Sequence, residues 1–243
     1  MAMNDELDQL LVCEKVTSED WEALGEILGM KTVPQPVLRR KSFNEEIRHN
    51  YGHTIINTWR NEYDPDYIDI LKGTAEKMGV PLKDHHTVVD IEDKLIVEAI
   101  DSMKAQIIKE KGADEWKMIE SEIDAEVEKM AAEGKFDPGV AAELKKYKGA
   151  ALMAALLGGK LAGFALYQVA VQSFFAISRA MGLKIGVAAA GPVIGKGLAF
   201  LLGPVGWAVS AAWLAFDLGN TNWKRTIPSV LTVAVFRRKY ELV

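Results

Sequence analysis

Apolar side chains recur every three or four residues along most of the chain, and strict alternation of apolar and polar positions is nearly absent. This spacing is typical of helices that bury one face. It is clearest after Thr87, where the apolar positions keep helical spacing as far as Lys111 and Gly112 follows. The pattern predicts an all-α fold, an irregular multi-helix bundle with an apolar, Gly/Ala-rich helical hairpin region towards the C-terminus.

Capping residues, prolines and glycines mark the expected ends of the helices. Ser42 and Glu45 form a capping-box pattern, and Asp137 with Pro138 is a typical helix start. Residues 30–40 contain Pro34 and Pro36 and are predicted to be a linker. The expected helices cover residues 4–12, 19–28, 42–60, 65–78, 87–111, 114–133, 138–148, 160–181, 204–216 and 229–240.

The same pattern divides the chain into three stretches. Residues 1–40 are expected to form a short helical module and a linker, and residues 41–136 an amphipathic helical region. Residues 137–243 form an apolar, Gly/Ala-rich helical region.

Acidic residues are distributed very unevenly. Residues 149–243 contain two carboxylates and nine Lys or Arg, whereas residues 1–148 contain 32 acids and 20 bases. The acid-poor part also contains two runs without any charge, residues 161–178 and 197–216. A part with this composition must be hidden from water, either in a protein core or in a bilayer.

Both environments stay open at the level of the sequence. Residues 197–216 have the length of about 20 that a membrane span needs, but Gly203 and Pro204 interrupt them. Residues 161–178 carry Gln168 and Gln172 one turn apart, and Arg179 returns to the same side. One interpretation is a buried helical hairpin inside a soluble protein. The other is a conditionally membrane-inserting segment, stored as in colicin-like pore formers. The function we predict is that of a membrane-associated or conditionally membrane-inserting protein, and the alternative is a soluble protein-interaction or assembly factor whose apolar half is only its core.

The membrane interpretation, or contact with a partner protein, assigns a set of contact residues. These are large apolar side chains of the acid-poor part, the polar stretch around residue 224, and the basic end of the last helix. The set is Phe164, Leu166, Phe174, Phe175, Leu201, Trp207, Trp213, Trp223, Lys224, Arg225, Arg237 and Arg238. Plain structural roles, as core residues, a connecting loop and a basic helix end, are the alternative for each group.

Candidate catalytic or metal-binding chemistry is sparse. Glu46 and His49 share a helix face and His53 follows one turn later, but di-iron bundles need two Glu-x-x-His copies and further Glu residues. Residues 191–197 lack the spacing and the Ser or Thr of a phosphate-binding loop. We therefore predict no catalytic residue, no metal and no cofactor, and the sequence favours a non-enzymatic protein.

Charge and cysteine content bear on compartment and partners. The net charge is −5 and no dense basic stripe is present, which argues against nucleic acid. The single cysteine, Cys13, suits a reducing cytoplasm, and the acidic N-terminus does not look like a signal peptide. The expected partners are an anionic membrane, a second copy of the chain or another protein. The expected location is the cytoplasm, with possible association with the inner membrane.

Two segments resemble a known family. Residues 52–60 read Gly-His-Thr-Ile-Ile-Asn-Thr-Trp-Arg, and residues 225–231 read Arg-Thr-Ile-Pro-Ser-Val-Leu before a basic pair. Together with the Gly-Pro-Val-Gly-Trp stretch at 203–207, they resemble the YaaW-like family of bacterial proteins of unknown function. His53 stands where that family usually has Asn. The resemblance implies a helical, cytoplasmic bacterial protein with an apolar C-terminal region, and it transfers no catalytic residue.

Overall fold

A computed structural model describes residues 5–32, 34–52, 65–161, 163–180 and 222–242. These residues form ten α-helices and no β-strand, which confirms the predicted all-α fold class. The helices are α1 (Glu6–Leu11), α2 (Ser18–Leu28), α3 (Pro36–Gly52), α4 (Tyr67–Met78), α5 (Val88–Lys111), α6 (Ala113–Ala132), α7 (Pro138–Leu144), α8 (Ala150–Leu157), α9 (Gly163–Ala180) and α13 (Trp223–Lys239).

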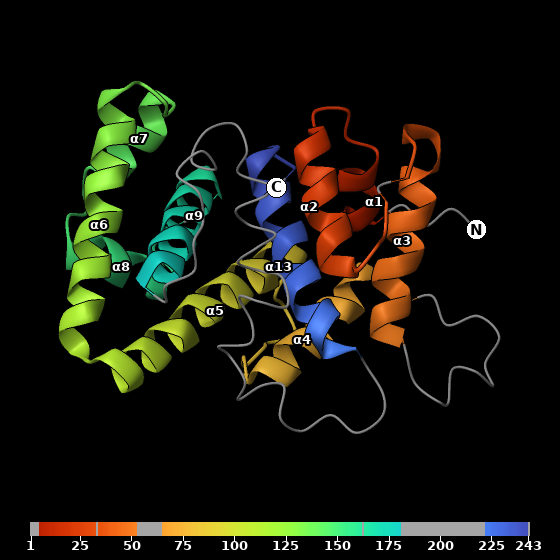
Figure 1. Ribbon diagram of the computed structural model, residues 1–243, viewed down its shortest axis with the longest axis horizontal. Helices are drawn as coiled ribbons and strands as arrows, with labels where there is room; N and C mark the ends of the chain where they lie inside the picture. Colours follow the sequence, from red (N-terminus) through yellow and green to blue (C-terminus); the bar gives the residue numbers. More distant parts are fainter. Residues whose placement is uncertain (1–4, 33, 53–64, 162, 181–221, 243) are drawn as a thin grey trace.

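The helices gather in two groups that α5 connects (Figure 1). One group contains the first four helices and α13, and we call it the terminal lobe because both ends of the chain lie in it. The other contains α6, α7, α8 and α9, and we call it the middle lobe. Helix α13 packs against α1, α2, α3, α4 and α5, and it also touches α9. The last helix of the chain therefore lies among helices that precede it by 110 residues or more.

Several helix ends follow the local chemistry of the sequence. The Thr17 side chain caps α2 by accepting from the Asp20 N–H, and α2 ends at Gly29, whose φ of 74° suits glycine. Thr87 and Asp90 form a capping box at the start of α5, where each side chain accepts from the other residue's backbone N–H. The long helix predicted over residues 87–111 is confirmed by these contacts.

Two helices begin earlier than the sequence pattern predicts. Helix α3 starts at Pro36, so residues 36–40 are not a linker and Ser42 lies inside the helix. Proline is favoured in the first turn of a helix, and Pro36 is a helix start rather than a breaker. Helix α13 begins at Trp223 with Pro228 inside it. Pro228 removes one intrahelical bond, the one to the carbonyl of Lys224, which lies in the exposed first turn.

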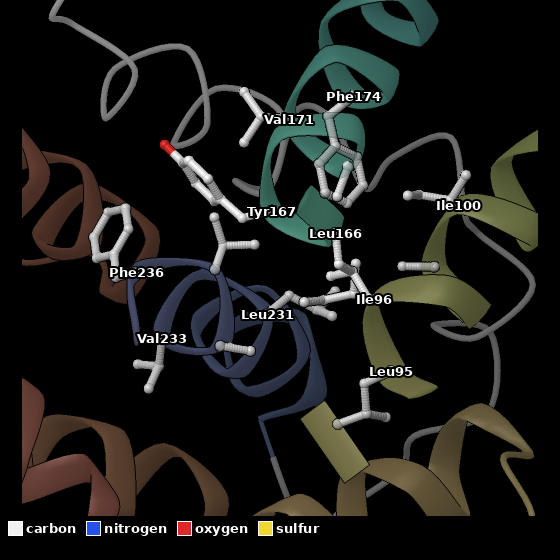
Figure 2. Close-up of a cluster of buried hydrophobic side chains, with 14 of the residues drawn as sticks. Leu95, Ile96, Ile100, Leu166, Tyr167, Val171, Phe174, Leu231, Val233 and Phe236 are labelled. Carbon is white, nitrogen blue, oxygen red and sulfur yellow. The ribbon is translucent and has the colours of Figure 1, made fainter. Parts of the chain in front are cut away.

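The centre of the molecule is an apolar layer between α5, α9 and α13 (Figure 2). Leu166 and Phe174 of α9, Ile96 of α5, and Leu231 and Phe236 of α13 are fully or almost fully buried there. Two residues of the predicted polar side of α9, Gln168 and Gln172, contact or lie within the protein interior. Gln168 is buried, and the Gln172 Nε2 donates to the Met130 sulfur of α6 at 3.4 Å. In this conformation α9 is a core helix.

No helix in the described part of the chain is long and apolar enough to span a bilayer. The predicted helix over residues 204–216, and the part of the predicted hairpin region from 183 to 203, lie outside the described residues. The division into stretches 1–40, 41–136 and 137–243 stays a prediction.

Candidate functional site

The basic end of α13 lies in the interior of the protein. The Arg237 Nε donates to the Glu92 Oε1 at 2.9 Å, and the Arg238 Nη1 donates to the Glu92 Oε2 at the same distance. Glu92 is 0% exposed and both arginines are 1% exposed. One carboxylate of α5 is therefore held between two guanidinium groups of the last helix. Removing these three charges from water is costly, and their mutual hydrogen bonds offset that cost.

Further contacts connect this charge cluster to α1, α4 and α5. The Tyr67 hydroxyl of α4 donates to the Glu92 Oε1 at 3.0 Å. The Arg237 Nη1 donates to the carbonyl of Glu6 in α1 at 2.8 Å. The Arg238 Nε donates to the Asp93 Oδ1 at 2.7 Å. We call Tyr67, Glu92, Asp93, Arg237 and Arg238 the C-terminal network.

The next two residues of the chain make a second contact, with α2. The Lys239 Nζ lies 2.5 Å from the Asp20 Oδ2, and the Tyr240 hydroxyl donates to the same carboxylate. The Tyr240 oxygen in turn accepts from the Thr17 N–H at 3.1 Å. Asp20 is 0% exposed. The three basic residues at the end of α13 are therefore the counter-charges of carboxylates in the acid-rich part.

Burial dominates the electrostatics of the C-terminal network. It raises the pKa of the Glu92 carboxyl above its ordinary value, against the opposing effect of Arg238 and Arg237. Burial likewise raises the pKa of Asp93, although the Arg238 guanidinium acts in the other direction. The pKa of Tyr67 is raised well above its usual range by burial and by the neighbouring Glu92 carboxylate. Tyr67 therefore stays a neutral hydrogen-bond donor.

A second buried ion pair, between α1 and α3, has the opposite character. The Arg48 Nη2 donates to the Asp5 Oδ2 at 2.8 Å. The Asp5 carboxylate also accepts from the N–H of Asp8 at 3.1 Å and from the N–H of Tyr67 at 2.9 Å. Burial alone raises the pKa of Asp5, but the Arg48 guanidinium and the two N–H groups outweigh it, so the pKa is lowered.

The structure separates the predicted contact residues into three groups. Leu166, Phe174, Arg237 and Arg238 are buried, so they touch neither a membrane nor a partner in this conformation. Phe164 is partly buried, and its ring packs beside the Tyr167 ring with 5.3 Å between the ring centroids. The side chains of Phe175, Leu201, Trp207 and Trp213 lie outside the described residues. The prediction that these residues act as contacts therefore requires a different conformation for the first group.

The polar stretch at the start of α13 lies against α3 and α4. The Asn222 N–H donates to the Asn50 carbonyl at 2.9 Å, and the Trp223 ring meets the Tyr51 ring edge-on with 6.0 Å between centroids. The Lys77 ammonium lies 5.8 Å from the Trp223 ring centre. Trp223 is half-buried and Lys224 is exposed. From Trp223 onward the stretch is therefore the first turn of α13 rather than a connecting loop, and the Lys224 side chain stays exposed.

The candidate metal residues lie in other contacts. The Glu46 Oε1 accepts from the Asn50 Nδ2 at 3.3 Å and lies 3.9 Å from the Arg225 Nη1. His49 is the last basic residue of α3, and His53 lies outside the described residues. Across the part of the chain that the structure covers, no group of three or more His, Cys, Asp or Glu side chains is placed to hold a metal ion.

Sequence reasoning missed the acidic partners of the C-terminal helix. Glu92 lies between Val88 and Ile96 at four-residue spacing, so the sequence places it on the apolar face of α5. A carboxylate at such a position needs a buried counter-charge, which is the signal that could have found the site. The identity of the partner had no local signal, because Glu92 and Arg237 are 145 residues apart.

These features define an all-α protein whose C-terminal helix is buried by charge pairs with its N-terminal half. The chain is 38% identical over 81 residues to a UPF0174 protein of Helicobacter pylori (strain J99). The match covers 33% of this chain and 32% of the relative, so it spans about a third of each. This partial similarity supports a relationship to an uncharacterised family of bacterial proteins. No family model and no solved structure matches the chain.

Proposed function

We propose that this chain is a non-enzymatic helical protein that acts by binding, either to another protein or to a second copy of itself. The burial of α13 carries the proposal, because this helix and α9 belong to the protein core in this conformation. The charged groups with the most perturbed surroundings, Glu92, Arg237 and Arg238, are engaged in holding helices together. They are therefore positioned for stability rather than for reaction with a substrate.

A second candidate function is conditional contact with an anionic membrane. The observation in its favour is the uncharged run at residues 197–216, within a part of the chain that has nine bases and two acids. Positive charge next to apolar surface favours anionic lipid head groups. The described helices α9 and α13 do not offer this surface, so contact would be made by the apolar run or would follow a rearrangement.

The family and the compartment belong to the same proposal. The partial similarity to the Helicobacter pylori protein is compatible with the YaaW-like resemblance of residues 225–231 and does not test it. A bacterial cytoplasmic location agrees with the single cysteine, Cys13, which is a free thiol.

Fractionation of the native protein tests the two functions against each other. The full chain is released from cells without detergent, centrifuged at high speed, and sized by gel filtration with light scattering. We expect the protein in the supernatant, in an assembly larger than its own 26.8 kDa. A soluble monomer in concentrated native extract would contradict the binding role. If the protein instead pellets with membranes and resists extraction with carbonate, the membrane function would be supported in place of the binding function.

Vesicle binding gives an independent measurement. Dye-loaded vesicles of anionic lipid and of zwitterionic lipid are mixed with the purified chain. We expect no dye release and no co-sedimentation with either vesicle. Lys224→Glu serves as the matched variant, because Lys224 is the exposed cation at the start of α13. Release from anionic vesicles that weakens in this variant would support membrane contact.

A further inference from the structure

A cleft with a volume of about 570 Å³ lies between the first half of α5 and the turn from α8 to α9. Its two walls come from the connecting helix and from the middle lobe. The volume falls in the range of roughly 300–1,000 Å³ that is usual for small-ligand sites, which often lie between helices or domains. Among the members of the C-terminal network, Asp93 lines this cleft.

The α5 wall of the cleft is polar and carries more acid than base. Its charged groups are Asp90, Asp93, Lys94 and Glu98, and His86 precedes them in the loop. Asp93 is paired with the buried Arg238. Two carboxylates then face a single ammonium group. Hydrogen bonds from the Thr87 N–H and hydroxyl lower the pKa of Asp90, so this carboxyl is ionised at neutral pH.

The histidine adds no positive charge at neutral pH. Partial desolvation and the nearby Lys94 ammonium lower the pKa of His86 below its ordinary value. Its Nδ1 accepts a hydrogen bond from the Lys83 N–H at 3.1 Å, which also requires the neutral ring nitrogen. The α5 wall therefore keeps a net negative charge.

The opposite wall is apolar and is closed by a helix end. Leu157 supplies the partly exposed side chain of this wall, Leu161 and Leu166 are buried behind it, and Gly158 and Gly159 expose their backbone. Helix α8 ends at Leu157, so the partial negative charge of its C-terminus lies on this wall. A cation is favoured from both sides, and an apolar chain is favoured by the partly exposed Leu157 and Val97.

We propose that this cleft binds a small amphiphilic amine, with its ammonium group near Glu98 and its apolar chain against Leu157 and Val97. The ligand class follows from the combination of a negative polar wall with an apolar one. An anionic amphiphile of the same length meets the same apolar surface but is repelled by the carboxylates. The site is separate from the partner-binding role proposed above, so either proposal can fail while the other holds.

Calorimetric titration of the full chain with octylamine tests the proposal. Octanoate and octanol have the same chain length with a negative and a neutral head, and all three are used below their aggregation concentrations. We expect saturable binding of octylamine at neutral pH, weaker binding of octanol and none of octanoate. Equal binding of the three, or no binding of octylamine, would overturn the proposal.

Three variants place the ligand in the cleft. Val97 is half-exposed and lines the cavity, so Val97→Trp fills it without changing a charge and should abolish octylamine binding. Glu98→Gln keeps an acceptor for the Ser102 hydroxyl and should weaken binding about fivefold, as expected for a partly exposed ion pair. Glu98→Lys should reverse the preference, from octylamine to octanoate.

The control is Glu76→Gln, an exposed carboxylate of α4 outside the cleft, which should leave binding unchanged. Circular dichroism melting checks that each variant is folded. If Val97→Trp does not fold, the reversal in Glu98→Lys decides the question. Unchanged selectivity in a folded Glu98→Lys would show that octylamine binds elsewhere.

Discussion

The two lobes of this molecule use charge in opposite ways. In the terminal lobe and at its contact with α5, the ion pairs of Arg48 with Asp5 and of Arg237 and Arg238 with Glu92 lie between helices, with side chains at most 13% exposed. In the middle lobe, the described ion pairs, such as Lys148 with Glu128, lie on the surface. Helix α9 is instead held by apolar contacts. The C-terminal helix is therefore fixed in place by specific charged side chains. The middle lobe is instead stabilised mainly by the apolar surface that its helices bury.

This comparison changes the meaning of the charge asymmetry in the sequence. The basic residues at the end of α13 look like a membrane flank or a favourable helix end when the sequence is considered alone. In the structure they neutralise Glu92, Asp93 and Asp20, which belong to the acid-rich part. The basic end of α13 therefore pairs with carboxylates of the acid-rich part, and the two parts bury these opposite charges against each other.

The largest expected effect comes from breaking the buried charge pairs. Arg238→Met keeps an apolar stem of similar length but leaves Glu92 and Asp93 without a shared partner. We expect a loss of about 3–5 kcal/mol in the free energy of unfolding, because one partner of a buried pair is removed. Urea unfolding followed by circular dichroism measures it.

The matched control in the middle lobe is Lys148→Met. This cation is also paired with a carboxylate, Glu128, but its side chain is 73% exposed. We expect no measurable change in stability. Similar losses in the two variants would contradict the contrast between the lobes.

A smaller loss is expected from a cavity on the middle-lobe side of the core. Leu166 is fully buried between α9, α5 and α13 (Figure 2). Leu166→Ala should lower the free energy of unfolding by roughly 3 kcal/mol, within the usual range for such cavities. Leu38→Ala is the control, because Leu38 is 52% exposed. Equal unfolding midpoints for the two variants would show that α9 does not contribute to the core as described.

Removing one hydroxyl sharpens the account of the C-terminal network. Tyr67→Phe deletes the donor to the Glu92 Oε1 and keeps the buried ring. We expect a loss of about 1.5–3 kcal/mol, the usual contribution of a hydrogen bond to a charged group. Thermal and urea unfolding both report it. An unchanged stability would mean that the two arginines alone satisfy the carboxylate.

The smallest effect is the difference in pH dependence between the two buried carboxylates. Asp5 has a lowered pKa in the folded state, so its contribution is present above its ordinary value of 3.8 and is lost as the pH falls below it. Glu92 has a raised pKa, so its contribution is present below 4.5 and is lost as the pH rises through the folded value. The cause of the contrast is backbone N–H donation to Asp5 and complete burial of Glu92.

Paired unfolding curves between about pH 3 and 7 test these signs. The stability advantage of the wild type over Asp5→Asn should shrink as the pH falls below about 4. The stability of the wild type relative to Glu92→Gln should instead fall as the pH rises above about 4.5. Parallel profiles for the two variants would refute the opposite pKa directions.

The sequence predicts the helices where local chemistry decides them. The spacing of apolar residues in α5 and the stop at Gly29 are encoded within a few residues. Pro36 and Pro228 mislead, because a proline is a start, an interruption or a tolerated inner residue depending on contacts further away. The proposed amine cleft has no local signal, since Glu98 and Leu161 meet only after the lobes have formed.

Hydrogen exchange of α13 tests the central claim most directly. Mass spectrometry of the peptides covering Trp223–Lys239 is recorded for the native chain with and without anionic vesicles. We predict slow exchange throughout the buried turns of this helix, unchanged by vesicles, because its arginines are held by Glu92 and Asp93. Fast exchange in the free protein that becomes slow when vesicles are added would show that α13 is a lipid-binding helix, and would contradict the account.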